Sequence, residues 1–121
     1  MAVILIVEDD ALICELAGMM IQDWGYRVLS AGDVDEALSL LRSPQQIDAL
    51  FTDIYLKKAV FGGCDLAHQA IKLRPALRVL YTTGDTVTDN LRTLFVKGAN
   101  CLRKPYTHHQ LKGAVVDLLA A

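Results

Sequence analysis

The feature that most constrains the fold of this chain is a strict alternation of short apolar runs with longer stretches of helical period, repeated five times. The first apolar run, Val3–Val7, is aliphatic throughout, which is typical of a strand covered on both faces. In residues 10–23, Leu12, Leu16 and Met19 recur at three- and four-residue spacing, and this period predicts a helix. Strand–helix units in strict alternation predict an α/β fold with a parallel sheet.

Local signals set the ends of the other predicted elements. Asp33 and Glu36 form a capping-box pattern that opens the second helix, which stops before Pro44. Gly98 is placed to end the fourth helix, and Thr107 to cap the fifth. Residues 54–63 are expected to form a loop. The predicted strands are 3–7, 27–31, 49–52 (leading into Asp53), 78–82 and 101–103, and the predicted helices are 10–23, 33–43, 65–74, 88–97 and 107–119.

Composition excludes several classes of function. The net charge is −2, from 12 basic and 14 acidic residues, so there is no broad basic field and we expect no direct DNA binding. The longest apolar run, residues 2–7, is far shorter than the ~20 residues of a membrane span, so we expect no membrane partner. The three cysteines form no close pair, which favours a reducing, cytoplasmic location. We expect residues 1–121 to form a single domain without an effector domain.

Chemistry-bearing residues follow the predicted strands. Parallel strands end at one edge of the sheet, where ligands bind in open α/β folds. At that edge this sequence places Glu8 and Asp9, then Asp53, Thr83 and Lys104. Two like charges about 4 Å apart repel by roughly 4 kcal/mol at an effective dielectric near 20, so the carboxylates require a cation. Mg²⁺ (or Mn²⁺) accepts such oxygen ligands and keeps positions for phosphate oxygens.

With a metal at this edge, the remaining groups acquire roles in phosphoryl transfer. The carboxylate of Asp53 is the candidate nucleophile, because aspartate can form an acyl phosphate. Lys104 is placed to neutralise charge on the phosphoryl oxygens, and Thr83 to hydrogen-bond the attached phosphate.

Four segments resemble the receiver domain of bacterial two-component response regulators. They are the acidic pair after Ile6-Val7, the strand Phe51-Thr52-Asp53, the segment Tyr81-Thr82-Thr83-Gly84, and Lys104-Pro105. The resemblance implies a flavodoxin-like fold of five strand–helix units, with strand order 2-1-3-4-5 and helices on both faces. It also implies a phosphorylation-dependent switch in the two-component (phosphorelay) class, rather than an enzyme beyond catalysis of its own phosphorylation and dephosphorylation.

The resemblance assigns further roles residue by residue. Glu8 and Asp9 are similar to the metal carboxylates, with Asp9 the direct ligand and the backbone carbonyl of Tyr55 a further one. Asp53 is similar to the phosphoacceptor and Thr83 to the switch hydroxyl. Lys104 is similar to the phosphate-binding lysine, and a cis bond to Pro105 is implied.

The implied partners are a sensor histidine kinase or a histidine phosphotransfer protein, and an unidentified downstream protein. A homodimer is a further prediction, through an apolar face made of Val87, Leu91, Leu94 and Val115.

The sequence departs from the family pattern at three places. The loop after Asp53 is about two residues longer, lacks the common proline and carries Lys57 and Lys58. Cys101 stands where the family has its switch aromatic, so Tyr81 and Tyr106 are the candidate substitutes. The first acidic position is a glutamate.

Three other functions compete with a phosphorylation switch. Cys101 keeps open a pseudo-receiver that binds partners without phosphorylation. A phosphatase of the haloacid dehalogenase class would need an acid two residues after the nucleophile, where this chain has Tyr55. A flavin or dinucleotide carrier would need a glycine-rich loop after the first strand, where this chain is acidic.

Overall fold

The computed structural model describes residues 1–57 and 59–120, and within them strands and helices alternate as predicted. The strands are β1 (Val3–Val7), β2 (Arg27–Ala31), β3 (Ala49–Asp53), β4 (Arg78–Thr83) and β5 (Asn100–Arg103). The helices are α1 (Ala11–Asp23), α2 (Val34–Arg42), α3 (Gly62–Leu73), α4 (Asp89–Arg92) and α5 (His108–Ala120).

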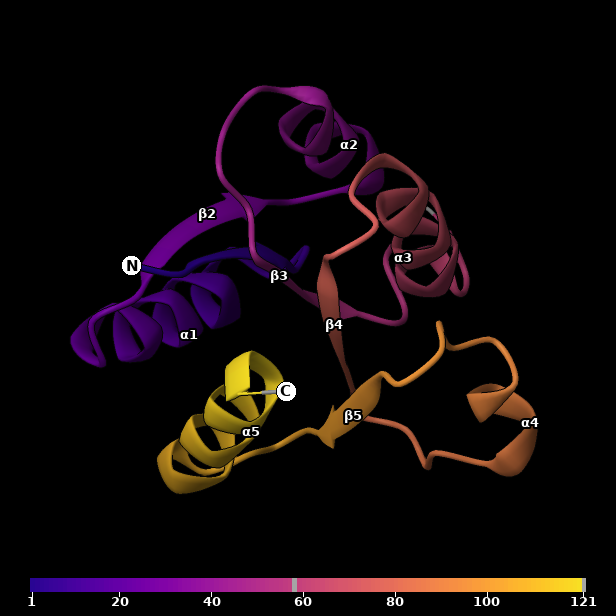
Figure 1. The fold of residues 1–121 in the computed structure, drawn as a ribbon. Coiled ribbons are helices and arrows are strands. Elements are labelled where there is room, and N and C mark those ends of the chain that lie inside the picture. Colours follow the sequence, from indigo (N-terminus) through magenta and orange to yellow (C-terminus); the bar gives the residue numbers. More distant parts are fainter. Residues whose placement is uncertain (58, 121) are drawn as a thin grey trace.

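The strands form one parallel sheet in the order β2-β1-β3-β4-β5, which confirms the predicted flavodoxin-like topology (Figure 1). Strands β1 and β3 each have a neighbouring strand on both sides and are buried along their whole length. In the register of the sheet, Val7 pairs with Thr52, and Asp53 pairs with Thr82. The carboxyl ends of the three central strands therefore lie side by side.

Helices cover both faces of the sheet, and each face has its own apolar core. Helices α1 and α5 cover one face, where Ile21 and Leu111 pack against β1 and β3 residues such as Ile4. Helices α2, α3 and α4 cover the other, where Leu38 and Leu66 pack with Leu50. Strands β1 and β3 contribute side chains to both cores, which is why both of their faces are buried.

The N-terminal caps predicted for the second and fifth helices are present, and Asp10 caps the first helix. The side chain of Asp10 accepts hydrogen bonds from two amides in the first turn of α1, at 3.0 and 3.2 Å. Asp33 accepts from the amide of Glu36 at 2.8 Å, at the start of α2. Thr107 and Gln110 each accept from the amide of the other, at 3.0 and 2.8 Å. These bonds satisfy amides that the helices leave without an internal partner.

The predicted extent of the fourth helix, 88–97, and its predicted end at Gly98 are wrong, because α4 covers only Asp89–Arg92. After it, the amides of residues 94 and 95 bond to carbonyls three residues back, which is a tighter turn than an α-helix. The amide of Val96 leaves the helical pattern and donates to the hydroxyl of Tyr81 at 3.0 Å. A side chain from β4 thus ends the helix before its local sequence would.

The third helix begins at Gly62, earlier than the predicted residue 65. Phe61 precedes it in the left-handed region, with φ 59° and ψ 20°, and makes no side-chain cap bond. Because the usual capping signal is missing, local sequence could not locate this start. Strands β3, β4 and β5 each extend one residue beyond the prediction.

The predicted apolar contact face is also wrong as a single surface. Leu91 and Val115 are both buried, and they belong to the cores on opposite faces of the sheet. Of the four residues, only Leu94 is exposed and Val87 half-buried. In the part of the chain that the structure describes, no helix has the length and apolar character needed to cross a membrane.

Candidate functional site

Three charged side chains meet at the carboxyl edge of the sheet. Glu8 follows β1, Asp53 is the last residue of β3, and Lys104 follows β5. The Lys104 Nζ atom lies 3.2 and 3.1 Å from the two carboxylate oxygens of Glu8 and 3.2 Å from Asp53 Oδ2. Lys104 follows β5, which lies one strand beyond β4, and its long side chain spans the extra distance.

The carboxylates of Glu8, Asp9 and Asp53 form a group that could hold a metal ion. One oxygen from each lies within 4.8 Å of the others. Glu8 and Asp53 are buried and Asp9 is half-buried, so the group opens to solvent on the side of Asp9. A set of carboxylate oxygens is the donor chemistry that Mg²⁺ prefers, and the residues present fit that ion.

Burial and mutual charge change the protonation of this site. Burial, together with the hydrogen bond and charge of Asp53, raises the pKa of Glu8 from 4.5 to about 7, although Lys104 acts in the opposite direction. Burial lowers the pKa of Lys104, but the hydrogen bonds and charges of Glu8 and Asp53 outweigh it and leave that pKa above its ordinary value. The ammonium is therefore held in its charged form between the two carboxylates.

Asp9 also contacts the segment between β3 and α3. Its Oδ2 atom accepts a hydrogen bond from the backbone amide of Lys57 at 2.6 Å. Sequence reasoning missed this contact, because a backbone donor leaves no residue-type signal. Lys58, the second lysine of this loop, lies outside the described residues.

Thr83 and Tyr55 lie near this group. Thr83 is the buried last residue of β4, and its hydroxyl accepts from the amide of Asp85 at 3.1 Å. Its carbonyl accepts from the amide of Lys104 at 2.8 Å, which fixes the start of the segment after β5. Among the described residues, no hydrogen bond joins the Thr83 hydroxyl to Asp53. Tyr55 follows Asp53 by two residues, and its ring lies 5.4 Å from that of Phe61.

The backbone of Asp53 is held by a close approach of Gly63. A Cβ atom on Gly63 would overlap the Asp53 carbonyl oxygen and lie 2.8 Å from its carbonyl carbon. The Gly63 amide also donates to the carbonyl of Ile54 at 3.0 Å. In the sequence, Gly62-Gly63 marks only the end of the predicted loop 54–63; two adjacent glycines after a candidate nucleophile are the signal that could have located this approach.

Tyr81, one of the two candidate substitutes for the missing switch aromatic, pairs with Cys101 in the register of β4 and β5. Its ring is fully buried and stacks on Phe95, with ring centroids 4.4 Å apart. Tyr106 packs on the opposite face of the sheet, 6.2 Å from the ring of Phe51. Tyr81 is therefore the aromatic ring beside Cys101. The Lys104–Pro105 bond is cis, as the resemblance implied.

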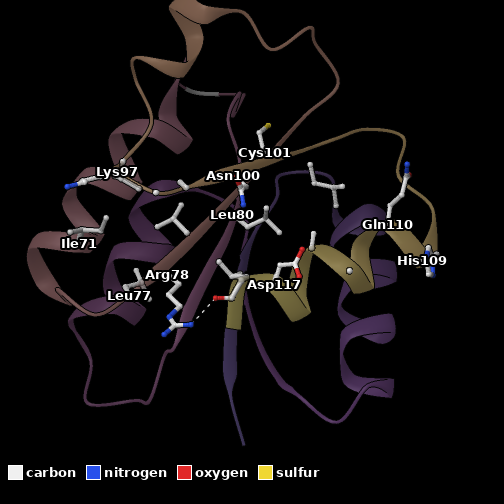
Figure 2. A pocket seen from close by; sticks show the side chains of 18 residues that line it. Ile71, Leu77, Arg78, Leu80, Lys97, Asn100, Cys101, His109, Gln110 and Asp117 are labelled. Carbon is white, nitrogen blue, oxygen red and sulfur yellow. Dashed lines mark hydrogen bonds between the residues drawn. The ribbon is translucent and has the colours of Figure 1, made fainter. Parts of the chain in front are cut away.

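A groove on the described surface is separate from this site. It has a volume of about 690 Å³ and lies between β5 and α5 (Figure 2). Leu80 and Cys101 contribute to its floor, and His109 and Asp117 of α5 line one side. None of the charged residues at the carboxyl edge of the sheet lines it.

A parallel sheet of this order, with carboxylates and a lysine at its carboxyl edge, defines the receiver class of the flavodoxin-like fold. The sequence model of the response regulator receiver domain matches residues 4–116, and the chain belongs to this family of two-component systems.

Known relatives agree with this assignment. The chain is 30% identical over 122 residues to the transcriptional regulatory protein ZraR of Escherichia coli (strain K12), and 28% identical over 118 residues to that of Klebsiella oxytoca. Each alignment covers 97% of this chain but 26% of the relative, so the chain spans about a quarter of their length.

Solved structures give the same fold. The response regulator receiver protein of Sinorhizobium medicae WSM419 is 28% identical, with a TM-score of 0.89, covering 99% of this chain and 95% of that one. A receiver domain protein of Clostridium thermocellum, also 28% identical with the same coverage, has a TM-score of 0.86.

Proposed function

We propose that this chain is a signalling switch that accepts a phosphoryl group on Asp53 from a sensor histidine kinase or a histidine phosphotransfer protein. The observation that carries the proposal is the setting of Asp53. Its carboxylate lies 3.2 Å from the Lys104 ammonium and within 4.8 Å of carboxylate oxygens of Glu8 and Asp9. Such a constellation serves charge neutralisation during phosphoryl transfer.

In the proposed reaction, a carboxylate oxygen of Asp53 attacks the phosphorus of a phosphohistidine. The O–P bond forms as the P–N bond breaks, and the electron pair of the broken bond goes to the imidazole nitrogen. The imidazole leaves neutral when its other nitrogen carries a proton. Lys104 neutralises charge on the phosphoryl oxygens, and the Thr83 hydroxyl donates a hydrogen bond to the attached group.

Glu8, Asp9 and Asp53, with the backbone carbonyl of Tyr55, are the groups that would hold Mg²⁺ or Mn²⁺. When bound, the ion supplies positive charge beside the transferring phosphoryl group. One oxygen from each of the three carboxylates lies within 4.8 Å of the others, close enough to bind a single ion, which supports this role.

The phosphoryl group is proposed to change which protein the domain binds, because its contacts differ between two conformations. The downstream partner is a protein and not DNA, in keeping with a net charge of −2. We place the domain in the cytoplasm. Its catalysis is limited to its own phosphorylation and dephosphorylation.

Intact mass after incubation with Mg²⁺ and acetyl phosphate tests the proposal. We expect one added phosphoryl group on the native chain and none on Asp53→Asn, which keeps the shape of the side chain but loses the nucleophilic carboxylate. An adduct of equal extent on Asp53→Asn would place the phosphoacceptor elsewhere. A native chain that takes no phosphoryl group from either acetyl phosphate or phosphohistidine would favour the pseudo-receiver alternative.

A further inference from the structure

Asp9 is held differently from the other two carboxylates of the candidate site. Lys104 contacts Glu8 and Asp53, but among the described residues no ion pair joins it to Asp9. The one hydrogen bond that the described residues make to the Asp9 carboxylate comes from the backbone amide of Lys57, at 2.6 Å. Asp9 is also the least buried of the three carboxylates. The side chain at the open side of the site therefore depends on a backbone donor for its orientation.

A compact turn fixes the position of that amide. Leu56, directly before Lys57, is buried in the core beneath α2 and α3. After Lys57, the amide of Ala59 donates to the carbonyl of Leu56 at 3.0 Å, and the amide of Gly62 donates to the carbonyl of Ala59 at 2.9 Å. The backbone is thus fixed on both sides of Lys57. Residues 54–63 contain no proline, which would have no amide hydrogen to donate.

The packing of Gly62 shows how little space the turn leaves. A Cβ atom on Gly62 would lie 2.9 Å from the Cβ atom of Ala59, which is too close for two carbon atoms. Its other contacts, with the side chain of Leu56 at 3.5 and 3.6 Å, are ordinary. A methyl group at position 62 should therefore displace the turn that carries Lys57, and removal of the Ala59 methyl group should relieve the clash.

We propose that the backbone amide of Lys57 is a positioning group for the candidate metal site, and that it holds the Asp9 carboxylate in place for a divalent cation. This inference rests on the proposed function and adds a group that touches neither the cation nor the phosphoryl group. A hydrogen bond to a charged carboxylate is stronger than one between neutral groups. A carboxylate that is ordered in advance loses less conformational freedom when the cation binds. By linkage, the cation strengthens the bond to Lys57 by the same factor.

The first test measures binding of Mg²⁺ alone, by NMR titration with MgCl₂, to the native chain, Lys57→Pro and Lys57→Ala. Both variants lack the lysine charge, so the difference between them isolates the amide. We expect Lys57→Pro to bind Mg²⁺ at least about tenfold more weakly than Lys57→Ala, as is common when the hydrogen-bond partner of a metal ligand is lost. Lys57→Ala should stay within about twofold of the native affinity, because the lysine side chain is exposed.

A second pair of variants moves the turn without changing Lys57. Gly62→Ala should weaken Mg²⁺ binding, and the double variant Gly62→Ala with Ala59→Gly should return it to within about twofold of the native affinity, because the two positions are in contact. Hydrogen exchange gives a readout that needs no variant. Saturating Mg²⁺ should slow exchange of the Lys57 amide in the native chain about tenfold, by the same linkage.

Labelling by acetyl phosphate separates positioning of Asp9 from general damage to the site. In Lys57→Pro we expect the Mg²⁺ concentration for half-maximal labelling to rise about tenfold, with the native maximal rate at saturating Mg²⁺. Equal Mg²⁺ affinity in Lys57→Pro and Lys57→Ala would overturn the inference, as would Lys57 exchange that Mg²⁺ leaves unchanged. A native chain that binds Mg²⁺ but takes no phosphoryl group contradicts the proposed function instead, while binding and exchange still decide the role of Lys57.

Discussion

At the scale of single residues, the position of Asp53 depends on Gly63 having no side chain. Gly63 approaches the Asp53 carbonyl so closely that a methyl group there would overlap backbone atoms, which cannot rotate away. We expect Gly63→Ala to lower the free energy of unfolding by about 3 kcal/mol, at the upper end of overpacking costs. It should also reduce acetyl phosphate labelling of Asp53. Urea denaturation and intact mass measure the two effects.

Gly113 provides the matched control, because it lies in α5 and a Cβ atom there meets nothing within 4 Å. Gly113→Ala should leave labelling unchanged and raise stability by up to about 1 kcal/mol, through its better helix propensity. If Gly63→Ala were as stable and as readily labelled as Gly113→Ala, the close approach would not hold the site.

The raised pKa of Glu8 predicts an unusual pH dependence of folding stability. Its pKa of about 7 in the folded protein exceeds the ordinary value of 4.5, so between these values the folded state binds a proton that the unfolded chain has lost. Stability in the presence of a chelator should therefore fall as pH rises from about 5 to about 7, by up to about 3 kcal/mol. Urea midpoints across this range measure the fall.

The Glu8→Gln variant isolates this contribution, because the amide does not titrate. We expect its stability to vary less with pH over the same range than that of the native chain. An equal slope in both proteins would assign the pH dependence to other groups.

At the scale of elements, α4 is the helix that tertiary contacts define. The hydroxyl of Tyr81 accepts from the amide of Val96 at 3.0 Å, and Tyr81→Phe would leave that buried amide without its acceptor. We expect a loss of about 1–2 kcal/mol and at least tenfold faster hydrogen exchange at Val96. Tyr26→Phe, at a half-buried ring elsewhere, is the control and should leave Val96 exchange unchanged. Unchanged exchange in Tyr81→Phe would mean that other contacts end the helix.

The elements that sequence predicted well are those fixed by local pattern. The aliphatic run of β1, the capping-box pattern of Asp33 and Glu36, and the stop before Pro44 each act over a few positions, and they located β1 and α2 to within a residue. The ends of α4 and α3 depend on Tyr81 and on the left-handed Phe61, which no periodicity of the segments themselves reveals. A distant side chain ends α4, and the backbone conformation of one residue sets the start of α3, so local pattern misses both.

The candidate site was predictable to a similar degree. Strand ends and residue types were enough to bring together the carboxylates and Lys104, because a parallel sheet fixes where its strands end. The contact of Asp9 with the Lys57 amide and the approach of Gly63 involve backbone atoms. Residue identity specifies such contacts only weakly, so they required the structure.

At the scale of the whole molecule, the two cores share one sheet and should unfold together. Leu66 belongs to the core beneath α3, whereas Trp24 packs against the core on the other face. We expect Leu66→Ala to cost about 2–5 kcal/mol, and to shift the Trp24 fluorescence midpoint as far as the circular dichroism midpoint. Leu111→Ala, in the core on the face of Trp24, should also shift the fluorescence and circular dichroism midpoints by equal amounts. A Trp24 midpoint that stayed at the native value in Leu66→Ala would show that the two faces unfold separately.

The central position of β1 has a consequence for folding while the chain is being synthesised on the ribosome. β1 is made before either of its partners, yet it pairs with β2 on one side and β3 on the other, and all five of its residues are buried. Until residue 53 has emerged, an apolar strand has one unpaired edge, which is the kind of surface that aggregates or recruits chaperones. The strand that ends in Asp53 is therefore also the one that covers the second edge of β1, so the phosphoacceptor and the protection of β1 arrive in the same step of synthesis.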